Sequence, residues 1–246
     1  MTPGAPPPRR PGAGHQTTVS RLGRPLRPGA RRLLRDVLPR VAIDLPPPGG
    51  VLEPAALFAP PEDPARPRPV WLEIGFGAGE HLAWQARQNP GVGMIGAEVF
   101  VRGVARLLRA IDEDGLENLR VYHGDARDLL AALPPATLER VFLLFPDPWP
   151  KTRHHKRRIV MPETLERLAA VMRERAELRL ATDDPDYVVW MLERLIPHPA
   201  FEWLARGPAD WRTRPGDWPG TRYEAKALAQ GRHPVYLRFR RRARLR

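Results

Sequence analysis

A carboxylate with little backbone freedom stands beside an aromatic ring at the most distinctive point of the sequence. Asp147 lies between Pro146 and Pro148 and is followed closely by Trp149. Each proline restricts its own backbone and that of the residue before it, so the position of Asp147 is narrowly fixed. A fixed acceptor next to a flat indole is suited to holding a planar heterocycle that carries amino groups. Pro-Asp-Pro also occurs in ordinary loops, which is the structural alternative.

A glycine-rich turn follows the apolar run 70–74, with glycine at 75, 77 and 79. Glycine adopts backbone conformations closed to other residues and lets a ligand approach the main chain, so we expect Gly75, Gly77 and Gly79 to contact a cofactor. The third glycine of the dinucleotide-binding fingerprint would fall at Glu80, which disfavours a nicotinamide enzyme. Glu73 lies inside the apolar run, where a lone carboxylate is unfavourable. Its expected partner is a bound ligand, the glycine amides or an arginine.

Two more acidic residues follow the next two apolar runs. Glu98 stands about 20 residues after the glycine turn, where an acidic residue accepts hydrogen bonds from ribose hydroxyls. Asp125 could meet the edge of an adenine, or it could cap the helix predicted at 126–133. The glycine turn, Glu98 and Asp125 fall on three successive strand ends, and together they indicate a cofactor that contains adenosine.

A basic run begins directly after Pro150 and therefore adjoins the proposed pocket. It consists of Lys151, Thr152, Arg153, His154, His155, Lys156, Arg157 and Arg158. Such a run is often only a solvated surface. If the heterocycle held by Asp147 is a base of a nucleic acid, however, the run would contact the neighbouring phosphates. The two adjacent histidines have no carboxylate at ligand spacing and have cationic neighbours, so we expect no metal.

Two later motifs complete the candidate residues. Asp184 before Pro185 fits the start of a helix, which leaves Asp183 to face the crevice. Thr221, Arg222, Tyr223 and Glu224 open another helical stretch, in which Thr221 and Glu224 could form a capping box. This local role does not exclude contact with a substrate.

The elements that must position these residues alternate between short apolar runs and helical stretches. The strands are predicted at 70–74, 93–99, 119–123, 140–145, 178–182 and 235–239, and helices at 31–41, 80–88, through 104–111, 126–133, 185–195 and 221–231. This alternation predicts an α/β fold, with a mostly parallel sheet and helices on both faces. Ligands bind such sheets beyond the carboxyl ends of the strands, where every motif above is placed.

Composition limits the class of protein and its partners. The 246 residues include 40 Lys and Arg against 28 Asp and Glu, a formal net charge of +12 that favours nucleic acid as partner. A GC-rich genome would explain arginine in place of lysine, but not the excess over acids. The absence of cysteine excludes disulfides, and no apolar run reaches the roughly 20 residues of a membrane helix, which suits a cytoplasmic protein.

Three segments are expected along the chain. Residues 1–30 are rich in proline, glycine and arginine, and they are predicted to form a flexible basic arm. Residues 31–69 are predicted to hold a short helix and a proline-rich connection, and 70–246 to form the α/β domain. A monomer is the favoured oligomeric state.

Taken together, the motifs resemble the bacterial tRNA (guanine-N7-)-methyltransferases. The matching stretches are 72–77, 96–99, 145–158, 181–183 and 221–224. The resemblance implies a Rossmann-like methyltransferase domain and transfer of a methyl group from S-adenosylmethionine to N7 of a guanine in the tRNA variable loop (guanine-46). It also implies roles for single residues. Glu73, Glu98, Asp125 and Asp147 would contact the cofactor, with Asp147 also catalytic; Lys151, Asp183 and 221–224 would contact the substrate, and 153–158 the RNA.

The sequence departs from the family pattern at three places. Phe100 stands where a histidine is frequent, His155 where an asparagine is frequent, and Arg222-Tyr223 where Lys-Phe is frequent. Two other functions remain open. One is a related methyltransferase of the same fold that acts on another RNA, a protein or a small molecule; a protein or small-molecule substrate would leave the basic run unexplained. The other is a non-catalytic RNA-binding subunit, which would leave the intact acidic residues unexplained.

Overall fold

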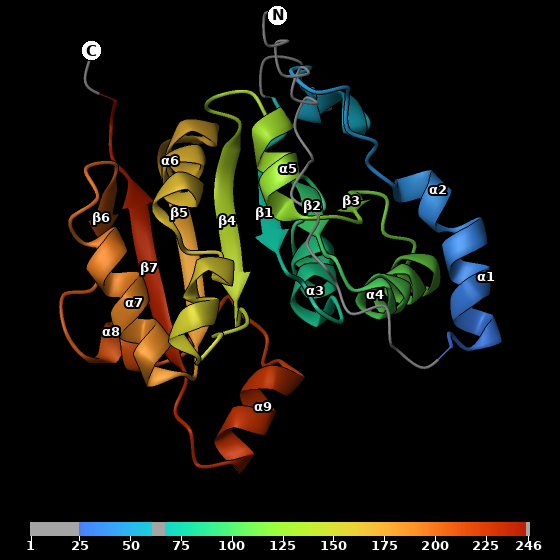
Figure 1. Cartoon of the computed structure of the whole chain (residues 1–246). Coiled ribbons are helices and arrows are strands. Elements are labelled where there is room, and N and C mark those ends of the chain that lie inside the picture. Colours follow the sequence, from blue (N-terminus) through green and yellow to red (C-terminus); the bar gives the residue numbers. More distant parts are fainter. Residues whose placement is uncertain (1–24, 61–66, 245–246) are drawn as a thin grey trace, which may run out of the picture.

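A mostly parallel sheet forms the centre of the molecule. The structure is a computed structural model that describes residues 25–60 and 67–244. Its 7-stranded sheet has the order β3-β2-β1-β4-β5-β7-β6, and β7 runs antiparallel to both of its neighbours (Figure 1). The strands are β1 Val70–Ile74, β2 Gly93–Ala97, β3 Leu119–Tyr122, β4 Leu138–Leu144, β5 Met172–Thr182, β6 Phe201–Trp203 and β7 Val235–Arg241. The predicted α/β fold with a mostly parallel sheet is confirmed.

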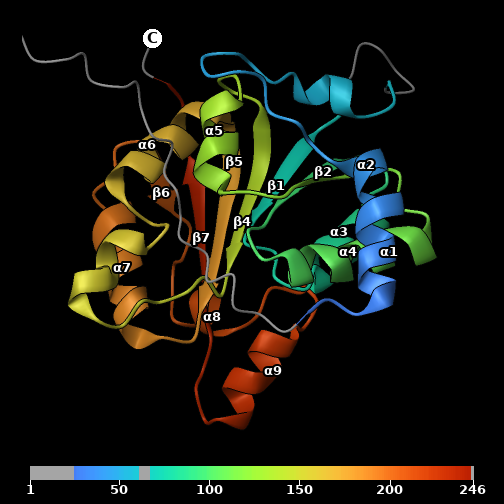
Figure 2. The same ribbon diagram turned by 45° about the vertical axis from the view of Figure 1, so that its right-hand side comes forward.

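Helices cover both faces of the sheet (Figure 2). One apolar cluster joins the sheet to α5 Ala126–Ala132, α6 Pro162–Val171 and α7 Pro185–Leu195. A second cluster joins it to α3 Glu80–Gln88, α4 Val101–Asp114, α1 Pro28–Asp36 and α2 Leu38–Val41. The remaining helical elements are η1 Pro54–Leu57, η2 Thr152–Arg157, α8 Ala209–Arg212 and α9 Arg222–Ala229. Within the described ranges, no helix is long and apolar enough to cross a membrane.

The chain order reverses at β1, which lies between β2 on one side and β4 on the other. Such a reversal point in a parallel sheet opens a crevice beyond the carboxyl ends of the strands. The glycine turn after β1, Glu98 after β2 and the Phe145–Trp149 loop after β4 therefore meet at one place.

The predicted boundaries hold best where the hydrophobic pattern is strong. β1, α3 and α7 have the predicted bounds, whereas β5 begins at Met172 rather than at residue 178. Its first half was missed because residues 173–177 are mostly charged; Glu177 accepts hydrogen bonds from Arg179 and from Arg238 on β7. α6 and β6 were not predicted.

The N-terminal prediction needs two corrections. α1 begins at Pro28, inside the range predicted to be a flexible arm, because proline suits the first turn of a helix. The helix predicted over 31–41 is divided at Val37, and α2 again has a proline in its first turn. Most of the predicted arm, residues 1–24, lies outside the described residues.

Candidate active site

A cavity of about 240 Å³ lies at the carboxyl ends of the central strands. Among the candidate residues, it is lined by Gly75, Gly77, Glu98, Asp125, Asp147, Arg157 and Tyr223. Phe100, Arg127, Phe145 and Trp149 line it as well. The fold thus brings the glycine turn, three of the predicted carboxylates and the Asp147 loop to one site.

Glu98 is fixed by the backbone of the turns around it. One carboxylate oxygen accepts a hydrogen bond from the Gly77 amide at 2.8 Å, and the other accepts one from the Phe100 amide at 2.9 Å. Gly77 has a φ of +58°, a conformation that other residues rarely adopt. Burial raises the pKa of Glu98, and the nearby charge of Asp147 raises it further. The carboxylate is therefore oriented but poorly solvated.

Gly103 of α4 supports the same turn, and the sequence motifs did not identify it. A Cβ atom at this position would lie 2.1 Å from the Gly77 carbonyl oxygen and 3.4 Å from Glu98. Only glycine allows the helix to come so close to the turn. The available signal was a glycine in the interior of an otherwise good helix, where it is usually unfavourable.

Asp125 caps a helix and also lines the cavity. It is the N-cap of α5 and accepts a hydrogen bond from the Arg127 amide at 2.9 Å. It also lines the cavity and forms an ion pair with the Arg127 side chain at 3.0 Å. Arg127 donates further hydrogen bonds to the carbonyls of Arg157 and Arg158 at 3.5 and 3.3 Å. This arginine, which the motifs did not single out, links the cofactor side of the cavity to the basic run.

Glu73 lies beneath the cavity and does not line it. Its carboxylate is 3% exposed and accepts a hydrogen bond from His81 Nδ1 at 2.6 Å. His81 in turn contacts Gln85, whose amide donates to the Asp217 carbonyl at 2.8 Å. The partner of Glu73 is therefore a histidine of α3, which none of the sequence-based alternatives named. Gly79 also lies off the cavity, and it packs against Leu107 of α4.

The Asp147 loop has a strained backbone at both ends. Phe145 and Trp149 have φ angles of +51° and +46°, a region unfavourable for side chains of this size. Such strain persists only where the surrounding structure enforces it, and it is common at functional sites. The Asp147 side chain is exposed to the cavity and has no hydrogen bond or ion pair to any described residue. Partial desolvation raises its pKa.

Arg158 does not face solvent as predicted for an RNA contact. It is 1% exposed, and its Nε donates a hydrogen bond to the Pro148 carbonyl at 2.7 Å. Its guanidinium lies over the rings of Tyr187 and Trp190, at 4.8 and 4.6 Å from their centroids, and 3.7 Å from Asp186. The RNA contact predicted for Arg158 requires an exposed side chain, but here α7 covers the guanidinium and Nε is bonded to the Asp147 loop.

The rest of the basic run divides between solvent and the protein. Lys151, Arg153, Lys156 and Arg157 are exposed, and the Arg157 guanidinium lies 4.9 Å from the centroid of Trp149. His155 instead turns inward against Trp190, with a ring distance of 5.1 Å. His154 meets the edge of Trp149 at 5.9 Å. Four cations of the run are thus exposed, and one of them, Arg157, lines the cavity.

The later motifs have strong local contacts. Asp183 forms an ion pair with Arg232 at 2.6 Å instead of lying free in the crevice, and Asp184 caps α7 as predicted. Thr221 caps α9, but Glu224 does not complete a capping box. It accepts hydrogen bonds from Arg214 at 3.0 Å and from the Tyr236 hydroxyl at 2.7 Å.

Arg222 and Tyr223, which lie between Thr221 and Glu224, reach toward the glycine turn. The Arg222 amide donates to Glu80 at 3.0 Å, and the Tyr223 ring lies against Gly77. α9 therefore closes one side of the cavity. Neither the ion pair of Asp183 nor the contacts of Glu224 could be inferred from the sequence, because their partners are distant along the chain or not part of a motif.

Comparisons with known proteins identify the class to which the chain belongs. Residues 67–237 match the model of the family described as "Putative methyltransferase". A solved rRNA methylase from Streptococcus thermophilus is 13% identical, with 72% of this chain and 88% of that chain covered and a TM-score of 0.48. The reversal of strand order, the glycine turn and the carboxylate after β2, together with the family match, define an S-adenosylmethionine-dependent methyltransferase with a Rossmann-like fold.

Curated relatives narrow the class further. The tRNA (guanine-N(7)-)-methyltransferase of Rhodospirillum rubrum is 51% identical over 91% of this chain and 87% of its own length. The protein of the same name from Ruegeria pomeroyi is 59% identical over 71% of this chain and 73% of its own length. The chain belongs to the tRNA (guanine-N(7)-)-methyltransferase family.

Proposed function

We propose that this protein transfers a methyl group from S-adenosylmethionine to N7 of a guanine in the variable loop of tRNA (guanine-46), with Asp147 as the catalytic residue. The main support for this proposal is the Asp147 carboxylate, which has no partner among the described residues and lines the same cavity as Glu98. A tRNA substrate would also place the activity in the cytoplasm.

Residues that line the cavity offer acceptors and negative charge that suit the cofactor. Gly75 and Gly77 leave the main chain open, and Glu98 can accept hydrogen bonds from ribose hydroxyls while the turn amides orient it. Burial raises the pKa values of Glu98 and Asp147, and repulsion between them adds to the shift at Glu98. A cationic ligand would offset this repulsion. Asp125, which Arg127 holds by an ion pair, would meet the adenine.

The chemistry requires alignment and charge stabilisation rather than removal of a proton. S-adenosylmethionine supplies an electrophilic methyl group on a positively charged sulfur. Guanine N7 has a free lone pair, so the protein needs no general base to activate it. As the purine becomes cationic, the fixed carboxylate of Asp147 stabilises the developing charge and can hold the donor edge of the base.

The exposed cations next to Asp147 support a polynucleotide substrate. Arg157 lines the cavity, and Lys151, Arg153 and Lys156 are exposed on the same short segment, where phosphate contacts would position the RNA without reading its sequence. Tyr223 also lines the cavity, against Gly77, and the Arg222 amide donates to Glu80 beside the glycine turn. We propose that these four cations, together with Arg222, Tyr223, Asp183 and Thr221, bind the substrate.

A direct test supplies the purified protein with labelled S-adenosylmethionine and tRNA. We expect labelled 7-methylguanosine in the nuclease digest, and no label in protein or DNA controls. The matched control is a tRNA with 7-deazaguanosine at the target position, because this nucleoside differs from guanosine only in having carbon in place of N7. Equal labelling of that RNA would show that the nucleophile is not N7 and would contradict the proposal.

Glu98→Gln tests the cofactor site with little change of shape. The amide can keep one acceptor, but it loses the charge that strengthens hydrogen bonds from the ribose, a difference of about 1.4 kcal/mol or more. We expect the affinity for S-adenosylmethionine to fall roughly tenfold or more by calorimetry. In the wild type, affinity should also fall as pH drops through the raised pKa of Glu98, because protonation removes the acceptor charge. An unchanged affinity in folded Glu98→Gln would contradict the role of Glu98.

A further inference from the structure

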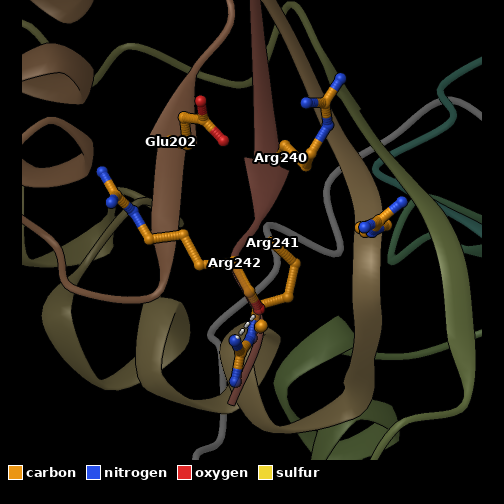
Figure 3. Close-up of a pocket in the computed structure, with 6 residues that line it drawn as sticks. Glu202, Arg240, Arg241 and Arg242 are labelled. Carbon is orange, nitrogen blue, oxygen red and sulfur yellow. Dashed lines mark hydrogen bonds between the residues drawn. The ribbon is translucent and has the colours of Figure 1, made fainter. Parts of the chain in front are cut away.

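A hollow of about 810 Å³ lies at the end of the sheet opposite the active-site cavity. It is lined by Arg175 near the start of β5, Glu202 on β6, and Arg240, Arg241, Arg242 and Ala243 at the end of β7. Figure 3 shows the labelled side chains of Glu202, Arg240, Arg241 and Arg242 around it. Four guanidinium groups thus share one open surface with a single carboxylate.

Two of these arginines lack the partners that neutralise others on the same sheet. Arg179 and Arg238 both pair with Glu177 at 2.7 Å, and Arg173 pairs with Glu139 at 2.5 Å. By contrast, Arg175 and Arg240 make no side-chain hydrogen bond or ion pair with any residue that the structure describes. Four arginines against Glu202 therefore leave the lining of the hollow with an excess of positive charge.

The other two arginines are partly committed to the protein and add to the local potential. Arg241 donates to the Ala169 carbonyl at 2.8 Å, and Arg242 donates to the Phe201 carbonyl at 3.0 Å. Burial lowers the pKa of Arg241, and the positive charge of Arg244 lowers it further. These contacts hold the end of β7 in place and so fix the floor of the hollow.

The backbone of Arg175 is strained. Its φ is +66°, although its side chain is exposed. It lies where the pairing of β4 with β5 shifts register, between Leu138–Met172 and Arg140–Glu177. Such irregularities in strands often redirect a side chain. Here the irregularity places a cation at the edge of the hollow.

We propose that this hollow, through Arg175, Arg240 and Arg242, binds the sugar-phosphate backbone of the tRNA substrate at a distance from the methylated guanine. This inference rests on the proposed tRNA substrate. The open shape and the spread guanidinium groups fit several phosphates of a polymer better than one enclosed small anion. Arg175 lies seven positions before Thr182, which is at the active-site end of β5, a span of about 23 Å at the usual rise of a strand. A folded tRNA is longer than this span.

The test compares R175A/R240A with wild type, because these two arginines have no partner to lose. We expect weaker tRNA binding, with a salt dependence flatter by about one to two units of slope in log K against log salt. The KM for tRNA should rise several-fold, while kcat and the affinity for S-adenosylmethionine should stay unchanged. A short RNA stem-loop with the target guanine should not distinguish the two proteins.

The control R106A/R109A removes the same charge from the exposed face of α4, which lies across the molecule from β7 (Figure 1). An unchanged salt slope in R175A/R240A would overturn the proposal, and so would an equal decrease in both variants, which would indicate only net charge. Methyl transfer by the wild type tests the proposed function separately, so the two failures are distinguishable.

Discussion

Asp147→Asn should lower the single-turnover rate at saturating tRNA and cofactor by about a hundredfold or more. The substitution keeps the size of the side chain, and Pro146 and Pro148 should keep the backbone in place. The amide oxygen still accepts a hydrogen bond, so part of the base positioning can survive. The negative charge facing the purine is lost, and that charge is the main term in the proposed stabilisation. Affinities for tRNA and S-adenosylmethionine should change far less than the rate.

The pH dependence of the same step gives a second measure. Partial desolvation raises the pKa of Asp147, so the carboxyl becomes protonated at a higher pH than an ordinary aspartate. The wild-type rate should therefore fall as pH decreases through that pKa, and Asp147→Asn should lose this dependence. A near-wild-type rate in the variant would reject Asp147 as the catalytic residue. A collapse of cofactor affinity together with the rate would assign it mainly to cofactor binding.

Arg158→Ala should also reduce turnover strongly, because Arg158 is a positioning residue for the Asp147 loop. Its buried Nε–H is the donor to the Pro148 carbonyl, directly after Asp147. Without it, the strained Phe145–Trp149 backbone loses a restraint, and displacement of a reacting group by about 1 Å can cost a hundredfold in rate. We expect a decrease of tenfold or more in the single-turnover rate. The salt dependence of tRNA binding should stay as in the wild type.

The neighbouring Arg157→Ala is the matched control, since Arg157 is exposed. It should weaken tRNA binding and flatten the salt dependence by about one unit of slope. Arg158→Lys keeps the positive charge and controls for loss of the fold. It should melt like the wild type and recover part of the single-turnover rate. If Arg158→Ala instead flattens the salt dependence as Arg157→Ala does and keeps the rate at saturation, Arg158 contacts RNA and the structural assignment is wrong.

The sequence alone was sufficient for the fold class, the family and the location of the cofactor cavity. β1, the glycine turn and α3 follow from local patterns, because an apolar run, left-handed glycines and helical periodicity need few distant contacts. Glu98 and Asp125 were found because the carboxyl ends of neighbouring parallel strands must meet at one edge. The Asp147 loop stood out through its composition, although its strained ends were not foreseen.

The tertiary structure alone decided what individual charged residues contact. Arg157 and Arg158 are the same residue type at adjacent positions, yet one is exposed and the other is stacked on Tyr187 and Trp190. Glu73 pairs with His81 because α3 packs back over β1. The arginine-lined hollow at the end of β7 exists because β5 and β7 run antiparallel, which brings residues 175 and 240 to the same end of the sheet. Burial and ion pairing depend on such distant neighbours, and a local pattern contains no information about them.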